Sequence, residues 1–231
     1  MTRPDASIIL PARGRAAQTA EQIPRLLATA GNVGWELIVV VDADADVAAA
    51  LRAVVAAQRD AGRPAPRVIE LPERRGYWNA LSIGSQHARG RLLGNIANDV
   101  LPGLHWLSRA VRTFDRVFTD GLGVVGWNDG LLFDGHAGHL LISRALANRW
   151  YGAAAWPTFY DHLWGDVEIC QRAIAEGRYV VDLRAVLYHN HPVVGRSVDA
   201  IYQYSHHREQ DDERIFAQRR QLQWPTLMPS D

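Results

Sequence analysis

The run ELIVVV at residues 36–41 constrains the fold more than any other stretch of this 231-residue chain. Continuous β-branched runs are typical of strands buried on both faces, as in parallel sheets. Parallel neighbours need long crossover connections, and segments of helical composition lie before and after this run. The sequence therefore predicts an α/β fold with a mostly parallel sheet flanked by helices.

Strand and helix alternate through the first half of the chain, which implies right-handed crossovers. We expect strands at 7–10, 36–41, 67–71 and 91–97, and helices at 16–30, 47–61, 77–88 and 102–118. The second half is less regular, with expected strands at 123–127, 139–143 and within 178–189, a helix at 165–177 and a helical tail at 198–222. We interpret 1–231 as a single domain divided into 1–118, an irregular 119–197 and the tail 198–231.

Composition excludes several classes of protein. The 25 basic and 25 acidic residues cancel, which argues against a general nucleic-acid binder. Cys170 is the one cysteine, so no disulfide forms within the chain, and we expect it in the core. No apolar run approaches the roughly 18 to 20 residues that span a bilayer, and no signal peptide is evident, so we expect a cytoplasmic protein without a transmembrane segment.

Carboxylates follow two of the expected strands. Asp42 and Asp44 come after the second strand, and Asp99 comes after the fourth. The carboxyl ends of parallel strands share one edge, where open α/β sheets bind their ligands. Acids gathered there repel one another unless a cation or a hydrogen-bonding ligand lies among them. Each could instead be a turn residue or a helix N-cap, and the residues alone leave both interpretations open.

A series of segments, in order, resembles the family-two glycosyltransferases of the GT-A fold. The segments are SIILPARGR (7–15), ELIVVVDAD (36–44), RGYWNALSIGSQHARG (75–90), NIANDVLPGLHWL (95–107), HLLISRAL (139–146), WGDVEICQRAIAEG (164–177) and LYHNHP (187–192). The resemblance implies a GT-A-like, Rossmann-type sheet with a nucleotide-sugar-binding half at 1–118 and an acceptor half at 119–197. It also implies inverting transfer of a sugar from a UDP-, dTDP- or GDP-type donor to a hydroxyl acceptor, such as a glycan, a lipid-linked acceptor or a small molecule.

The resemblance also implies a divalent metal ion, Mn²⁺ or Mg²⁺. The Asp-x-Asp metal motif of the family appears as Ala97-Asn98-Asp99, with the first acid missing. Asp99 is the expected ligand, joined by the late histidine His189 in preference to His191. One carboxylate can suffice because such ions take further ligands from the diphosphate and from water.

The donor nucleotide is expected to contact the ends of the first two strands and the start of the third helix. The expected contacts are Pro11, Ala12, Arg13, Asp42, Asp44, Arg75 and Asn98. The Asp pair of the family is split here by Ala43. Arg13 and Arg75 could equally be solvated.

Asp166 is the expected general base, because inverting transfer needs a carboxylate to take the proton of the acceptor hydroxyl. Glu168 lies about 200° around the helix from Asp166, so only one of the two can face the site. Glu168 is then a solvated acid or a support for the base. Trp164, Trp127 and His191 are possible acceptor contacts or supports, and either tryptophan could instead be core.

Two other functions compete with this interpretation. A nucleotide-sugar-binding module would bind the donor without turnover. A nucleotidyltransferase would need a Gly-rich basic loop after the first strand, which PARGR matches poorly. The mixed charges of 205–220 predict a solvated helix face.

Overall fold

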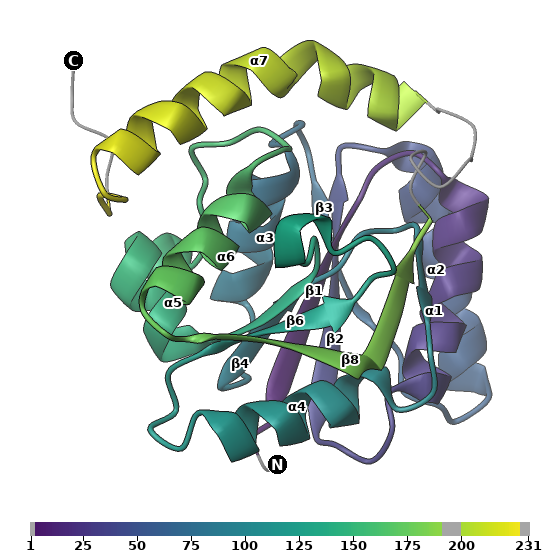
Figure 1. Ribbon diagram of the computed structural model, residues 1–231. Coiled ribbons are helices and arrows are strands. Elements are labelled where there is room, and N and C mark those ends of the chain that lie inside the picture. Colours follow the sequence, from purple (N-terminus) through teal and green to yellow (C-terminus); the bar gives the residue numbers. More distant parts are fainter. Residues whose placement is uncertain (1–2, 191–199, 227–231) are drawn as a thin grey trace.

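The computed structural model describes residues 3–190 and 200–226 and contains one mixed sheet with helices on both faces (Figure 1). The elements are β1 (Ala6–Ala12), α1 (Ala16–Thr29), β2 (Trp35–Asp42), α2 (Ala45–Asp60), β3 (Arg67–Leu71), α3 (Tyr77–Gln86), β4 (Leu92–Asn95), β5 (Val100–Pro102), α4 (Trp106–Val117), β6 (Val124–Asn128), the 3₁₀ turn η1 (Phe133–Gly135), β7 (Leu140–Ser143), α5 (Arg144–Tyr151), the 3₁₀ turn η2 (Gly152–Ala154), α6 (Gly165–Ala175), β8 (Tyr179–His189) and α7 (Ala200–Gln221). The predicted α/β fold class is confirmed.

The strand order is β3-β2-β1-β4-β7-β6-β8-β5. Strands β1 to β4 pair in parallel, as do β6 and β8, while β7 runs antiparallel between β4 and β6. Because β7 is reversed relative to both neighbours, β6 and β8 point the same way as β1 and β4. The carboxyl ends of all these parallel strands therefore lie along one edge of the sheet.

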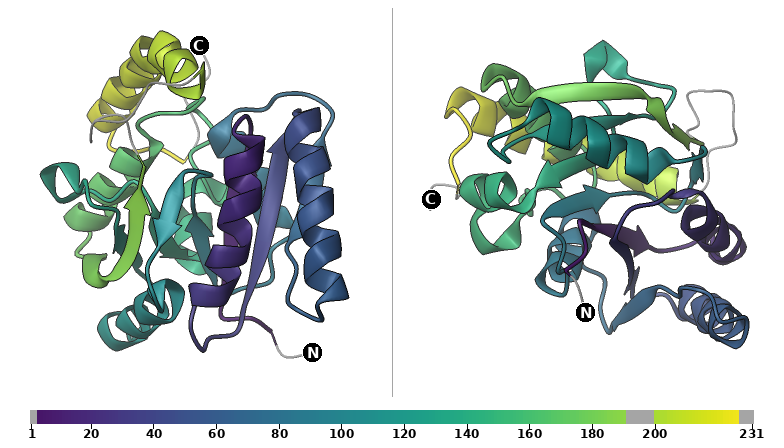
Figure 2. Two further views of the ribbon diagram at one scale, coloured as in Figure 1. Left: turned by 90° about the vertical axis from the view of Figure 1, so that its right-hand side faces the viewer. Right: turned by 90° about the horizontal axis from the view of Figure 1, so that it is seen from below.

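The run in β2 is apolar throughout because the sheet has a hydrophobic core on each side. Val39 contributes to a cluster under α1, α2 and α4, whereas Val40 faces a second cluster under α3, α5 and α6. Successive side chains of a strand point to opposite faces, so both sets of positions must be apolar. Figure 2 shows α1 and α2 lying side by side against this sheet.

The fourth helix begins later than the sequence predicts. Pro102 does not lie in its first turn but ends the short strand β5, which pairs antiparallel with the end of β8. Helix α4 starts at Trp106, after His105 in a left-handed conformation with φ 63°. The prediction of a helix from Pro102 was wrong because the pairing partner of this segment lies over eighty positions along the chain, at Leu187–His189.

The helical tail is present as α7, but its charged face is not wholly solvated. Asp212 is 2% exposed and Arg219 is fully buried. The prediction of a solvated face was wrong for these two side chains, because both find partners in the segment before and within α6. Among residues 3–190 and 200–226, no helix has the length and apolar character needed to cross a bilayer.

Candidate active site

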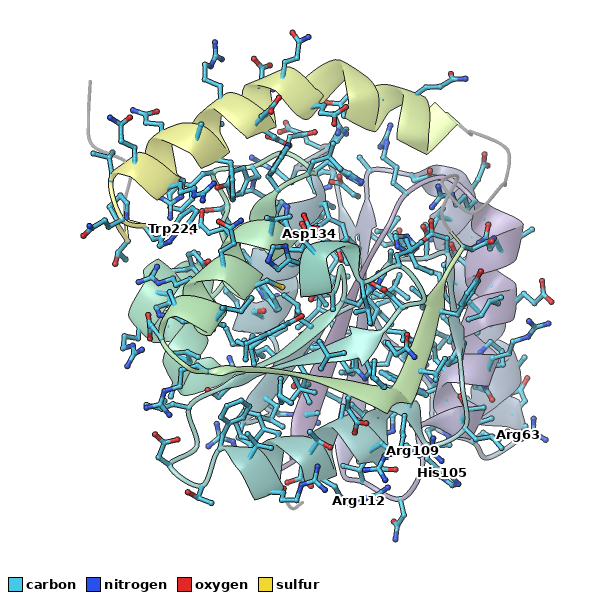
Figure 3. All side chains as sticks on the ribbon, viewed as in Figure 1. Arg63, His105, Arg109, Arg112, Asp134 and Trp224 are labelled. Carbon is cyan, nitrogen blue, oxygen red and sulfur yellow. The ribbon has the colours of Figure 1, made fainter. Side chains whose placement is uncertain are left out.

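The candidate site lies at the carboxyl ends of β1, β4, β6 and β8, toward the end of the molecule that α7 covers (Figure 1). The side chains of His105, Arg109 and Arg112 mark the opposite end (Figure 3). Each of the four strands is followed at this edge by residues with polar or charged side chains. This is where an open α/β sheet places a ligand site.

Asp99 is held between two cationic or protonatable side chains. Its Oδ2 accepts a hydrogen bond from Arg15 Nη1 at 2.8 Å, and its Oδ1 lies 3.3 Å from His189 Nε2. Asp99 is 4% exposed and Arg15 is 11% exposed, so the pair is largely shielded from water. The ring of His139 packs edge-on against His189, with centroids 4.7 Å apart.

The side chain of Asn98 ties the loop after β1 to the segment beside Asp99. Its Nδ2 donates to the carbonyl oxygens of Arg13 and Gly14 at 3.3 Å and to Thr19 Oγ1 at 3.1 Å. Its Oδ1 accepts from Arg15 Nη1 at 3.2 Å. A carboxylate has no donors for the two carbonyls, so only the amide can fasten the loop after β1 in this way.

Asp166 stands at the first turn of α6. The helix begins after Trp164, which has φ 69°, and Gly165 lies so close to Trp78 that a Cβ there would come within 2.3 Å of its ring. A Cβ built on Gly138 would lie 3.6 Å from Asp166 Oδ2 and 3.5 Å from Asp129 Oδ2. The two carboxylates therefore flank the same glycine.

Burial, joined by the nearby charge of Asp129, raises the pKa of Asp166 to about 6. The backbone N–H groups of the helix start and the charge of His189 act in the opposite direction. A half-buried carboxylate with such a pKa can accept a proton near neutral pH.

The acids after β2 are engaged by backbone N–H groups. Asp42 accepts from the N–H groups of Arg75 at 2.6 Å and Gly76 at 3.0 Å, which ties β2 to the start of α3. Asp44 is the N-cap of α2, accepting from Val47 at 3.0 Å, and also accepts from Gly14 at 2.8 Å. Both acids thus shape the rim of the site, and their expected contact with a nucleotide stays a prediction.

The family model for glycosyl transferase family 2 matches residues 7–149. This match covers more than half of the chain. The chain belongs to glycosyl transferase family 2. A comparison with curated protein sequences finds no match.

Solved structures extend the likeness from the family to the three-dimensional fold. A mannosyltransferase from Pyrobaculum calidifontis, in complex with GDP-Man and Mn²⁺, has a TM-score of 0.67 at 21% identity, over 84% of this chain and 59% of that one. TarS 1–349 from S. aureus has a TM-score of 0.60 at 13% identity, over 81% of this chain and 61% of that one. The chain thus spans about three fifths of the length of both structures. The GT-A fold expected from the sequence is confirmed.

The glycosyltransferase family implies a divalent metal ion, and the side chains of the site include oxygen and nitrogen atoms that could bind one. Asp99 and His189 are close enough to supply two ligands together. The described ranges hold no group of three or more His, Cys, Asp or Glu side chains that could enclose a metal ion. Two protein ligands fit a hard cation that takes its remaining ligands from a diphosphate and from water.

The residues proposed as acceptor contacts differ in how deeply they are buried. Trp127 is fully buried, and its Nε1 donates to the carbonyl of Trp106 at 3.2 Å, so of the alternatives open for this residue the structure supports the core position. Trp164 is half-buried against Phe216 of α7, with ring centroids 4.8 Å apart. His191 lies outside the described residues.

Glu168 is not a solvated acid but a buried ion-pair partner of α7. It is fully buried, its two oxygens accept from Arg219 at 2.7 Å each, and Oε2 also accepts from the Tyr160 hydroxyl at 2.6 Å. It points away from Asp166 into the interface with α7, as their spacing of two on a helix requires.

The other residues expected to contact the donor lie at the end of β1, in the loop after it, and just before α3. Pro11 and Ala12 are the last residues of β1, and both are buried, so their expected contact with a nucleotide stays a prediction. Arg13 donates to the carbonyls of Asp42 at 2.6 Å and Ala43 at 2.9 Å. Arg75 is exposed, 3.5 Å from Glu73.

Sequence reasoning missed two polar residues of this edge, Asp129 and Asn95. Asp129 follows β6, so the signal that singled out Asp99 after β4 could also have found it. It is 2% exposed and accepts from Leu131, Leu132 and Gly138 N–H groups at 2.9 to 3.1 Å. Asn95 is the last residue of β4, but the apolar Ile96 and Ala97 follow it, so the sequence does not mark it as the end of a strand.

Proposed function

We propose that this chain transfers a sugar from a nucleoside-diphosphate sugar to a hydroxyl acceptor, with inversion at the anomeric carbon. The observation that carries the proposal is Asp166, a half-buried carboxylate with a pKa near 6. It shares one sheet edge with the cluster of Arg15, Asp99 and His189. A base and a charged cluster on one edge are what displacement of a diphosphate by a hydroxyl requires.

In this mechanism Asp166 accepts the proton of the acceptor hydroxyl as its oxygen attacks the anomeric carbon. The bond from that carbon to the diphosphate oxygen breaks on the opposite face, and the diphosphate leaves with its negative charge. Arg15, which pairs with Asp99, would offset part of that negative charge. A Mn²⁺ or Mg²⁺ ion held by Asp99 and His189 would supply further charge neutralisation when bound.

The similarity to a mannosyltransferase bound to GDP-Man and Mn²⁺ supports a nucleotide-sugar donor of the GDP, UDP or dTDP type and a divalent metal ion. The proposed acceptor is a hydroxyl of a glycan, a lipid-linked acceptor or a small molecule. The donor is expected to contact the strand ends that carry Arg13, Asp42 and Asn98. Acceptor contacts belong to the loops around Asp129 and Trp164.

Thermal melting with GDP, UDP and dTDP, each with and without Mn²⁺, tests the donor site. A ligand that binds the native state at about 100 times its Kd stabilises it by about 2.7 kcal/mol. We expect one nucleotide to raise the melting temperature in the presence of Mn²⁺, and Asp99→Asn to abolish that dependence on metal. Asp134→Asn, which changes an exposed acid, is the matched control and should behave like wild type.

Turnover separates an enzyme from a binding module. With the nucleotide sugar that binds, release of free nucleoside diphosphate is measured for wild type and Asp166→Asn. We expect Asp166→Asn to keep the nucleotide-induced melting shift and to lose turnover. A wild-type protein that binds the donor with no turnover toward any acceptor would favour the binding module, and the absence of binding to any nucleotide would overturn the proposal.

A further inference from the structure

Tyr77 is a residue of the site edge that neither its sequence nor the proposed mechanism assigns a role. It is the first residue of α3, and its backbone N–H donates to the carbonyl of Asp161 at 2.9 Å. Its ring packs edge-on against Trp78, with centroids 5.2 Å apart, and at a tilt against His162, with centroids 5.6 Å apart. These contacts fix the direction in which the phenol points.

The buried amide of Asn95 determines which way the Tyr77 proton points. The backbone N–H of Leu140 donates to Asn95 Oδ1 at 2.9 Å, which identifies the carbonyl end of the amide. The Nδ2 end therefore donates, to the carbonyl of Gly138 at 3.1 Å and to the Tyr77 hydroxyl oxygen at 3.2 Å. Tyr77 is the acceptor in this bond, so its own proton must be directed elsewhere.

The surroundings of Tyr77 leave this proton available to a ligand. In the part of the chain that the structure describes, no protein acceptor takes a hydrogen bond from the Tyr77 hydroxyl. The residue is partly exposed, whereas Asn95 is completely buried beneath it. Burial, with the charges of Asp166 and Asp99 acting in the same direction, raises the pKa of Tyr77, so the hydroxyl stays protonated at neutral pH.

We propose that the Tyr77 hydroxyl donates a hydrogen bond to an oxygen of the transferred sugar. The inference rests on the proposed function, in which the diphosphate lies at Asp99 and the acceptor hydroxyl at Asp166. The sugar then lies between these two carboxylates. Asn95 links the Tyr77 hydroxyl to the carbonyl of Gly138, and a Cβ on Gly138 would lie 3.6 Å from Asp166 Oδ2, so Tyr77 lies on the Asp166 side of this edge. Because Asn95 occupies a lone pair of the phenol oxygen, Tyr77 acts as a donor and selects a sugar oxygen that accepts.

Binding of matched ligand pairs tests this contact. Calorimetry with Mn²⁺ measures the Kd of GDP, UDP and dTDP, and of GDP-mannose, UDP-glucose and dTDP-glucose, for wild type and Tyr77→Phe. We expect Tyr77→Phe to leave the Kd of the nucleoside diphosphate within about twofold and to weaken the matching nucleotide sugar by about three- to tenfold. Tyr204→Phe, which removes the hydroxyl of an exposed tyrosine on α7, should change neither value.

Each result has one meaning. Equal weakening of nucleotide and nucleotide sugar by Tyr77→Phe, or no weakening of either, overturns the sugar contact and leaves the donor site intact. Equal Kd values of the wild-type protein for the nucleoside diphosphate and for the matching nucleotide sugar also overturn the sugar contact. A wild-type protein that binds no nucleotide refutes the proposed function, and the sugar contact falls with it.

Discussion

The surroundings of Asp166 both raise and lower its pKa, and the resulting pKa determines how well it can act as a base. Burial and the carboxylate of Asp129 penalise its charge, while His189 and the N–H groups at the start of α6 favour it. The balance leaves the pKa of Asp166 at about 6, below neutral pH but far above that of an exposed aspartate. Such a group is mostly ionised at neutral pH and still basic enough to take a hydroxyl proton.

The pH dependence of turnover should therefore follow Asp166. We expect kcat/KM to fall by about tenfold per pH unit below a midpoint near 6, because the protonated carboxyl cannot act as a base. Asp166→Asn should lower kcat by roughly 10²- to 10⁴-fold. Initial rates from about pH 5 to about pH 8 with the identified donor measure both effects. A midpoint that stays near 6 in the residual activity of Asp166→Asn would assign the titration to another group.

Ionisation of Asp166 should lower the free energy of unfolding at pH values above its pKa. The native carboxyl titrates at about 6 and the unfolded one near 3.8, so the native state binds this proton more tightly. The stability contributed by protonation is fully present below about pH 3.8 and is lost as pH rises through about 6. Asp166→Asn should therefore melt at a higher temperature than wild type at about pH 8, and the gap should close near pH 4. Calorimetric melting across this range would contradict the burial argument if wild type were the more stable at about pH 8.

At the scale of elements, α7 holds the segment that leads into α6. Asp212 of α7 accepts from three consecutive backbone N–H groups, those of Asp161, His162 and Leu163, at 2.9 to 3.0 Å. Two turns further along, Arg219 pairs with Glu168 of α6 inside the core. The helix with the most polar sequence therefore fixes the loop and the helix that present Asp166.

Removing only one partner of the Glu168–Arg219 ion pair should lower the free energy of unfolding. Arg219→Met leaves the carboxylate of Glu168 buried without its cation, and we expect a loss of about 3–5 kcal/mol in the free energy of unfolding. Arg220→Met, an exposed neighbour, should change it by less than about 0.5 kcal/mol. Urea unfolding measures both values.

A double variant separates charge burial from packing. Glu168→Gln combined with Arg219→Met removes both charges and keeps an acceptor for the Tyr160 hydroxyl. We expect it to recover more than half of the stability lost in Arg219→Met. Equal losses in the single and double variants would mean that packing of the Arg219 side chain, and not the stranded charge, stabilises α7.

Local patterns predicted the elements whose cause is local, and missed those whose partners are distant. The apolar run of β2 reflects two cores, so periodicity alone identified it. Strand β5 depends on pairing with the far end of β8, and Pro102 was therefore misplaced in a helix. Asp99 and His189 were predicted to act together because of the family resemblance, and they lie 3.3 Å apart. The burial of Arg219 against Glu168 had no such signal, because no segment that carries the resemblance includes Arg219 and its charged neighbours indicate a solvated helix.

At the scale of the whole molecule, the sheet joins the two halves of the chain. Strand β7 pairs with β4, so Leu92 of the first half lies opposite Ser143 of the second. Strand β8 pairs with β6 and then with β5, which returns the end of the second half to the segment after β4. Each hydrophobic cluster also contains side chains from both halves.

Because the core is shared, the halves 1–118 and 119–197 should unfold together and not as separate domains. Native-state hydrogen exchange should then give the slowest amides of β1 and β2 and those of β6 and β7 the same opening free energy, equal to that of global unfolding. Bound nucleotide should raise both sets by the same amount, because a ligand of the native state stabilises the whole cooperative unit. Exchange in β6 and β7 through openings several kcal/mol cheaper than those of β1 would show that the acceptor half unfolds alone. The site would then lie between a stable half that carries Asp99 and a labile half that carries His189.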